Sequence, residues 1–257
     1  MSAKILFYDI ETSPNIGFTW GKYDQHVPAF IQEVKMLCVS YKWSGENNTS
    51  VATIRDFPGY KPGITKVNDK GLTEFLWGLF DEADVLIAHN GKNFDDKVVR
   101  TRFLDNQLAP PSPWKSIDTL QQARKLFKLN SNKLDDLGQD LGLGRKVAHE
   151  GMSLWIKCME GDEDAWKRMV KYAKQDVVLL EKVYDELRPW MTNLPNLAQF
   201  EDDPLSKCPK CTSARLTKRG TYRTNTATYQ RLQCQDCGAW TRASKSDKQK
   251  NSDMRGI

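Results

Sequence analysis

The sequence predicts an α/β fold in which helices flank a mixed sheet, followed by a small C-terminal zinc ribbon. Two observations carry this prediction. Residues 1–190 contain short apolar stretches typical of strands, interspersed with stretches of helical spacing, which together indicate a layered α/β domain. Residues 208–257 contain two Cys-x-x-Cys pairs, a spacing typical of a zinc-binding module.

Four strands are predicted from runs of apolar and β-branched residues. The first runs into acidic residues at its end, and a turn-rich stretch at residues 44–48 separates the second from the third. The predicted strands are residues 4–10, 36–43, 50–55 and 85–89.

Five helices are predicted from apolar residues at helical spacing. The longest is amphipathic and stops before Pro189, because proline cannot continue a helix. The predicted helices are residues 72–80, 94–108, 121–127, 133–141 and 163–187.

These segments are divided between two domains. We expect the α/β domain over residues 1–191 and the zinc ribbon over residues 207–243. Residues 192–206 between them are rich in Asn, Pro and acidic residues and are interpreted as a linker. The polar residues 244–257 are predicted to form a disordered tail.

The composition excludes several classes of protein. Hydrophobic residues make up 39% and aromatic residues 10%, enough for most of the chain to fold. No apolar run approaches the roughly 18 residues that a membrane helix needs. The N-terminal residues lack the architecture of a signal peptide. We therefore expect a cytoplasmic protein whose cysteines stay reduced.

The net charge of +5 is unevenly distributed along the chain. Residues 201–257 hold 12 Lys and Arg against 6 Asp and Glu, so they account for +6, and residues 1–200 are left with −1. A basic C-terminal module suggests a polyanionic partner, although a solvated charged surface has the same composition.

Four of the six cysteines form the two pairs. In a reducing compartment, paired knuckles indicate four zinc thiolates, and a redox dithiol is the less favoured alternative. Because the module is too short to bury a sufficient core, one structural Zn²⁺ would supply much of its stability. Cys38 and Cys158 are interpreted as ordinary buried thiols. The predicted zinc ligands are Cys208, Cys211, Cys234 and Cys237.

Three groups of polar residues are candidates for a catalytic site. Asp9 and Glu11 are two apart on a strand and therefore share a face, where they repel each other unless a cation lies between them. Asp95 lies in the first turn of a helix, where the helix dipole alone would also favour it. Tyr172 and Asp176 share a helix face beside a buried surface. Each group by itself would also fit a solvated strand or helix surface.

The order of these groups resembles that of a known family. Asp9-Ile10-Glu11-Thr12, then Asn90-x-x-x-Phe94-Asp95, then Tyr172-x-x-x-Asp176 resembles the DEDD class of 3′–5′ exonucleases, DnaQ-like proteins of the ribonuclease H-like fold. The tyrosine four residues before the last aspartate is similar to the tyrosine subclass. Residues 117–120 and 133–143 are also similar to connecting segments in the exonuclease domains of family B polymerases.

The resemblance implies a two-metal mechanism. Asp9, Glu11, Asp95 and Asp176 would hold two Mg²⁺ or Mn²⁺ ions, and Tyr172 would position the attacking water. Because an unperturbed tyrosine has a pKa of about 10, orientation suits it better than proton abstraction.

The resemblance also implies a substrate and its contacts. The product would be a nucleoside 5′-monophosphate released from a 3′ end. The backbone of Thr12 would lie near the terminal nucleotide, and Asn90 and Phe94 are also predicted to contact nucleic acid. Asp96 is set aside because it follows Asp95 directly and should point elsewhere around the helix. Asp118 is expected to cap the next helix.

Basic and aromatic residues are interleaved in the ribbon, and they suit a nucleic-acid backbone with stacked bases. The predicted contacts are Arg223, Tyr229 and Arg231; a ribbon that only stabilises protein contacts is the alternative. In the loop after Glu11, Phe18, Trp20 and Tyr23 could stack on terminal bases or pack in the core.

Together these residues predict a metal-dependent 3′–5′ exonuclease whose zinc ribbon helps to hold nucleic acid, with single-stranded DNA ends favoured. An RNA exonuclease, a structure-specific endonuclease on the same fold, and a non-catalytic nucleic-acid-binding adaptor are the alternatives. A replication or repair role would need a protein partner in trans.

Overall fold

The computed structural model describes residues 2–23, 26–204, 206–250 and 252. The chain divides into two compact units. One comprises residues 4–183, and the other comprises residues 184–257 together with residues 1–3. Each unit is described by itself below.

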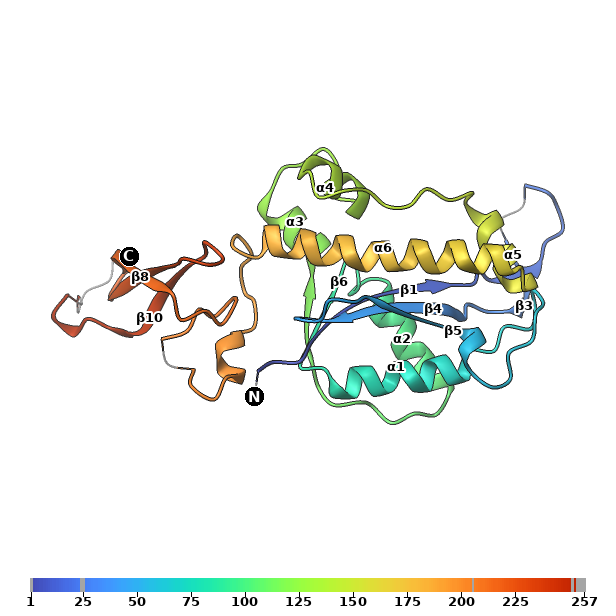
Figure 1. Ribbon diagram of the computed structural model, residues 1–257, viewed down its shortest axis with the longest axis horizontal. Coiled ribbons are helices and arrows are strands. Elements are labelled where there is room, and N and C mark those ends of the chain that lie inside the picture. Colours follow the sequence, from blue (N-terminus) through green and yellow to red (C-terminus); the bar gives the residue numbers. More distant parts are fainter. Residues whose placement is uncertain (1, 24–25, 205, 251, 253–257) are drawn as a thin grey trace. The chain divides into compact units, whose positions relative to one another are not determined.

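A five-stranded mixed sheet forms the centre of the first unit (Figure 1). Its strand order is β5-β4-β1-β6-β7. β1 pairs antiparallel with β4 and parallel with β6, so the sheet changes direction at β1. The strands are β1 (Ile5–Thr12), β4 (Met36–Trp43), β5 (Ser50–Thr53), β6 (Val85–Ala88) and β7 (Lys115–Asp118). The predicted mixed sheet is therefore confirmed.

Helices cover both faces of this sheet. Figure 1 shows α1 (Lys70–Glu82) and α2 (Asp95–Asp105) on one face and α6 (Glu163–Leu187) on the other. The first layer packs through edge-on rings, as Tyr8 of β1 meets Phe80 of α1 with ring centroids 5.0 Å apart. The connections between the layers contain three shorter helices, α3 (Thr119–Leu126), α4 (Leu134–Asp140) and α5 (Met152–Glu160).

Several elements differ from the sequence prediction. β1 continues two residues beyond its predicted end, to Thr12, and the strand predicted to Arg55 turns into a 3-10 helix at Ile54. The additional elements are β7, α5 and a hairpin of β2 (Ile16–Phe18) and β3 (Ala29–Gln32). The hairpin leaves most of its side chains in solvent, so it lacks the apolar alternation by which strands are recognised.

The second unit contains the ribbon, an antiparallel sheet in the order β10-β9-β8. Its strands are β8 (Leu216–Arg223), β9 (Thr228–Cys234) and β10 (Trp240–Ser246), and β8 and β9 form an antiparallel hairpin. β10 extends three residues beyond the predicted end of the ribbon at residue 243. Of the predicted tail, residues 251 and 253–257 lie outside the described residues. Within the described ranges, no helix is long and apolar enough to cross a membrane.

Candidate active site

Three carboxylates from two elements meet beside the sheet. Asp9 and Glu11 are two residues apart on β1 and so point to the same face of the sheet. Asp176 reaches them from α6. One carboxylate oxygen from each lies within 4.8 Å of the others. Asp176 is only 1% exposed. The structure therefore brings together three of the four predicted metal ligands.

Burial and mutual repulsion make this cluster electrostatically unfavourable without a cation. Burial, and then the charges of Asp95, Glu11 and Asp176, raise the pKa of Asp9 well above its ordinary value. Burial, with the charge of Asp176 next, raises the pKa of Glu11 to about 8. Crowded carboxylates of this kind are satisfied by protons or by a cation.

The two carboxylate oxygens of Asp176 show whether the cluster suits a cation. Its Oδ2 accepts from Lys146, but its Oδ1 is buried and has no hydrogen-bond partner among the described residues. A buried carboxylate oxygen without a partner is costly, and binding of a cation would remove that cost. Oxygen ligands of this kind suit Mg²⁺ or Mn²⁺. The residues therefore fit the predicted metals.

Lys146 is a site residue that the sequence did not reveal. Its Nζ lies 2.5 Å from Asp176 Oδ2 and 3.4 Å from the Tyr172 hydroxyl. Its backbone N–H donates to Asp135 Oδ1 at 2.6 Å, which fixes the loop that carries it. Burial lowers the pKa of Lys146, but the facing carboxylates outweigh burial and leave the pKa above its ordinary value. Lys146 therefore stays charged and offsets part of the cluster.

Asp95 and Asp96 have separate environments. Asp95 Oδ1 accepts from the backbone N–H of Ile10 at 3.2 Å, so the Asp95 side chain lies against β1. Burial raises its pKa to about 7. Asp96 instead accepts from the Tyr8 hydroxyl and from Ser116 Oγ at 3.3 Å. Asp95 is not one of the three closest carboxylates, but it adds to their repulsion.

Tyr172 lies almost buried beside Asp176. Its ring packs against His149, with centroids 4.8 Å apart, and against Trp155 at 6.1 Å. Burial and the neighbouring carboxylates raise the pKa of its hydroxyl above the ordinary value. The group is therefore a neutral phenol near pH 7, which can donate a hydrogen bond but cannot act as a base.

Two of the residues predicted to contact nucleic acid, Asn90 and Phe94, lie in the segment between β6 and α2, and the third, Thr12, ends β1. Asn90 has a positive φ of 70°, and its N–H donates to Asp118 Oδ1 at 3.0 Å. Asp118 also accepts from Gln121 N–H at 3.2 Å, which confirms the expected cap of α3. Phe94, at the start of α2, is exposed, and Thr12 stands at a register shift of β1.

Two hollows share Asp135 and Lys146, the residue that pairs with Asp176, in their walls. One, of about 600 Å³, reaches toward Asn90 and Arg124, and the other, of about 580 Å³, reaches toward Tyr172. Cationic side chains line both. The sequence did not single out these residues, because they lie on separate segments that only the folded chain brings together. The cationic lining residues are Arg124, Lys133, Arg145 and Lys146.

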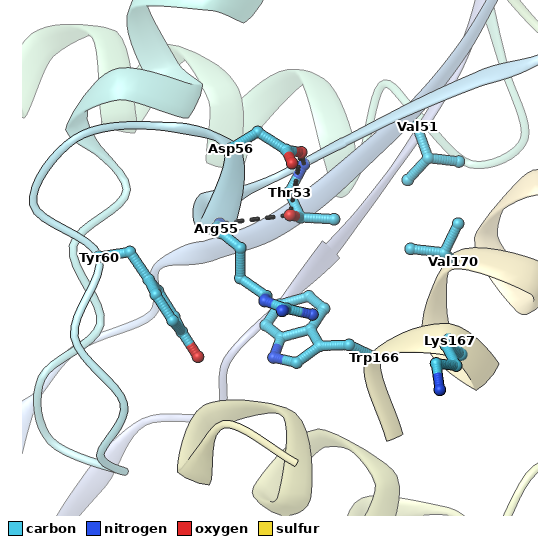
Figure 2. Close-up of a pocket in the computed structure, with 8 residues that line it drawn as sticks. All are labelled: Val51, Thr53, Arg55, Asp56, Tyr60, Trp166, Lys167 and Val170. Carbon is cyan, nitrogen blue, oxygen red and sulfur yellow. Dashed lines mark hydrogen bonds between the residues drawn. The ribbon is translucent and has the colours of Figure 1, made fainter. Parts of the chain in front are cut away.

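A further pocket, of about 590 Å³, lies between β5, the 3-10 turn after it and α6 (Figure 2). The Arg55 guanidinium lies over the Trp166 ring, 5.8 Å from its centroid, and pairs with Glu163 at 2.5 Å. Trp166 Nε1 and the Tyr60 hydroxyl are buried there without a partner in the described part of the chain. The carboxylates of the cluster do not line this pocket.

The aromatic residues that follow Glu11 are exposed rather than packed in the core. Trp20 is 90% and Tyr23 is 88% exposed, and Phe18 at the end of β2 is also exposed. The sequence allowed these residues either to stack on terminal bases or to pack in the core, and their exposure excludes core packing.

The four ribbon cysteines converge as predicted. Cys208 Sγ lies 3.8 Å from Cys237 Sγ, and Cys211 Sγ lies 3.6 Å from Cys234 Sγ. Four sulfurs at tetrahedral corners about 2.3 Å from zinc would be about 3.8 Å apart, so the geometry fits Zn²⁺. All six cysteines lie in the described ranges and are free of disulfides, and Cys38 and Cys158 are buried thiols.

The predicted ribbon contacts fall on two faces of the sheet. Tyr229 and Arg231 are two apart on β9 and share one face. Arg223 of β8 lies opposite Thr228, the neighbour of Tyr229, and therefore points to the other face. The structure separates Arg223 from the other two.

A mixed sheet flanked by helices, with a carboxylate cluster formed by its central strand β1 and by α6, defines a layered α/β protein with an acidic site. A family model described as the RNase_H superfamily matches residues 48–188. This match spans more than half of the chain, and the chain belongs to the RNase_H superfamily. No curated protein gives a significant match to the sequence.

Among solved structures, the chain is similar to the family B DNA polymerase from the hyperthermophilic archaeon Pyrobaculum calidifontis. The TM-score is 0.52 at 14% identity, over 73% of this chain and 25% of the polymerase. At this identity the likeness shows a shared fold, and this chain matches only about a quarter of the polymerase.

Proposed function

We propose that this protein is a metal-dependent 3′–5′ exonuclease that releases nucleoside 5′-monophosphates, with single-stranded DNA ends as its favoured substrate. Membership of the RNase_H superfamily supports a nuclease-like function. The observation that carries the finer proposal is the cluster of Asp9, Glu11 and Asp176, in which a buried oxygen of Asp176 has no partner among the described residues.

The acidic residues have distinct tasks in this proposal. Asp9, Glu11 and Asp176 hold the metal ions, and Asp95 completes the set from α2. Bound divalent ions would lower the pKa of a water molecule and neutralise charge that develops on the phosphate. Lys146 holds Asp176 in place through the 2.5 Å contact with its Oδ2.

Tyr172 acts as a hydrogen-bond donor that orients the attacking water. Its raised pKa supports this role over that of a base. The exposed ring of Phe94 packs against the terminal base, and Thr12 and Asn90 contact the terminal nucleotide. The cationic hollows beside Lys146 accept the phosphates that follow. The zinc ribbon assists in holding the strand.

Digestion of matched oligonucleotides tests the proposal. DNA and RNA strands, single and paired, are labelled at the 5′ end and incubated with Mg²⁺ or Mn²⁺. We expect products that shorten one nucleotide at a time from the 3′ end, fastest on single-stranded DNA. Internal cuts would indicate an endonuclease, and faster loss of RNA would reverse the substrate preference.

Asp176→Asn provides the matched test of the site. We expect it to reduce the rate by at least about 10³-fold, because it removes a charged metal ligand without changing side-chain volume. Asp164→Asn is the control: it is the same change on the same helix, at an exposed residue paired with Lys167. Full activity in purified Asp176→Asn would contradict the assignment.

A further inference from the structure

One face of the ribbon sheet carries an alternating row of rings and guanidinium groups. Tyr229 and Arg231 share a face of β9, as argued from their spacing. Tyr222 of β8 lies directly opposite Tyr229, and Arg242 of β10 lies directly opposite Arg231, so both point to that face. Trp240 is two residues before Arg242 and joins them.

The cations of this row stack on its rings. The Arg242 guanidinium lies 3.9 Å from the centroid of Tyr229 and 5.5 Å from that of Tyr222. The Arg231 guanidinium lies 4.7 Å from the centroid of Trp240. Such contacts hold flexible arginines in fixed places, which lowers the entropy lost when they bind a ligand. We call Tyr222, Tyr229, Arg231, Trp240 and Arg242 the ribbon ladder.

The ladder is open to solvent and strongly basic. Tyr222 and Trp240 are each 47% exposed. Residues 216–246 carry six Lys and Arg against one acidic residue, Asp236. Exposed aromatic rings beside fixed cations suit a ligand that has both flat apolar faces and negative charges.

Arg231 is also fixed by the backbone. Its Nε donates to the carbonyl of Arg219 at 2.9 Å, next to Gly220, whose φ is 68°. The strand register shifts there, between Lys218 and Thr221. The bulge therefore points a carbonyl toward Arg231 and leaves the remaining N–H groups of its guanidinium for a ligand.

The opposite face of the same sheet lacks this arrangement. Arg223 and Lys218 lie there, opposite Thr228 and Leu232. Thr228 is buried, and its hydroxyl donates to the carbonyl of Lys250 at 3.1 Å, so the chain after β10 covers part of that face. The two faces thus carry similar charge, but the aromatic rings named above lie on only one of them.

We propose that the ribbon ladder binds single-stranded nucleic acid by stacking unpaired bases on Tyr222, Tyr229 and Trp240, with Arg231 and Arg242 contacting the phosphates between them. A base pair in a duplex hides its faces, so stacking of this kind selects unpaired strands. The inference deepens the proposed function and rests on nucleic acid being the substrate. It assigns the preference for single strands to one face of the ribbon.

A pair of charge-removing substitutions separates the ladder from general charge. Arg242→Ala and Lys218→Ala each remove one positive charge, from opposite faces of the ribbon. Binding is measured by fluorescence anisotropy with labelled 20-nucleotide DNA and RNA strands and the matching duplex. The Asp9→Ala background prevents cleavage, and zinc content verifies that each ribbon is folded.

We expect Arg242→Ala and Trp240→Ala each to weaken single-strand binding about 5- to 100-fold, and Trp240→Phe to restore most of the loss. Lys218→Ala should change affinity less than 3-fold. Equal losses for Arg242→Ala and Lys218→Ala, or unchanged affinity in Trp240→Ala with its zinc retained, would overturn the ladder. Equal affinity of the Asp9→Ala protein for the duplex would overturn it as well.

The nuclease assay distinguishes the two proposals. Tight, ladder-dependent binding by a protein that cleaves no oligonucleotide would refute the exonuclease and leave the ladder standing. Processive cleavage with all ladder variants at wild-type affinity would support the exonuclease and refute the ladder.

Discussion

At the scale of single residues, the carboxylates of the cluster are tied to protons as much as to metals. The pKa of Glu11 is about 8 and that of Asp95 about 7, both raised first by burial. Ordinary values lie near 4, so the folded, metal-free protein holds protons that the unfolded chain has lost at neutral pH. These groups stabilise the fold fully below about pH 4, and their contribution is lost as the pH rises through 7 and 8.

The raised pKa values of Glu11 and Asp95 lead to a prediction about metal binding. Because a divalent ion must displace these protons, its binding at pH 7 should release protons and should tighten as the pH rises from 6 to 8. Calorimetric titration with Mn²⁺ in two buffers of different ionisation enthalpy measures the release. The rise in melting temperature with Mn²⁺ should be larger at pH 8 than at pH 6. Heats that are equal in both buffers would contradict the prediction.

The sequence revealed the acidic residues of the site but not Lys146, the cationic side chain that pairs with Asp176. Asp9, Glu11 and Asp176 are recognisable because a strand repeat of two and a helix repeat of four place them on fixed faces. Lys146 lies in a loop 30 residues before Asp176, and no local periodicity relates the two. Its position depends on tertiary contacts, such as the bond from its N–H to Asp135, that a linear pattern does not contain.

At the scale of elements, predictability follows burial. α6 was predicted at its observed bounds because its apolar residues repeat regularly over seven turns. β7 has only four residues, two of them buried, and is too short for such a pattern. The β2–β3 hairpin was missed for the opposite reason, since its large side chains face water.

That hairpin yields a second prediction. Trp20 buries little, so Trp20→Ala should leave the melting temperature within about 2 °C of wild type. If its ring stacks on unpaired bases, the same change should raise KM for single-stranded ends about 5- to 100-fold and leave kcat nearly unchanged. Leu104→Ala, at a 77% exposed apolar residue of α2, is the control and should change neither. An unchanged KM in Trp20→Ala would assign the hairpin another role.

At the scale of the whole molecule, the two units rely on different forces. Residues 4–183 bury an extensive apolar core, whereas β8 has hardly any buried side chain. The cysteine spacing made the ribbon recognisable, because zinc chemistry requires few residues at fixed distances. The third strand, β10, was not recognised, because its alternating polar residues resemble an unstructured tail.

The ribbon should therefore depend on its metal. Cys211→Ser should reduce the zinc content from about one ion per chain and remove hydrogen-exchange protection from β8, β9 and β10. Cys158→Ser, at a buried thiol outside the cluster, is the control and should retain the zinc. Full protection of β9 in the zinc-free Cys211→Ser protein would show that the ribbon folds without metal.

The central sheet also ends abruptly on both sides. β5 and β7 are its outer strands, and each has only four residues. At the end of β5, Asp56 accepts from the N–H of Thr53 at 2.7 Å, so the chain curls away from the sheet before another strand can align with it. Short outer strands are poor templates for intermolecular β-pairing. The sheet is thus protected from growing into aggregates even where its margins face water.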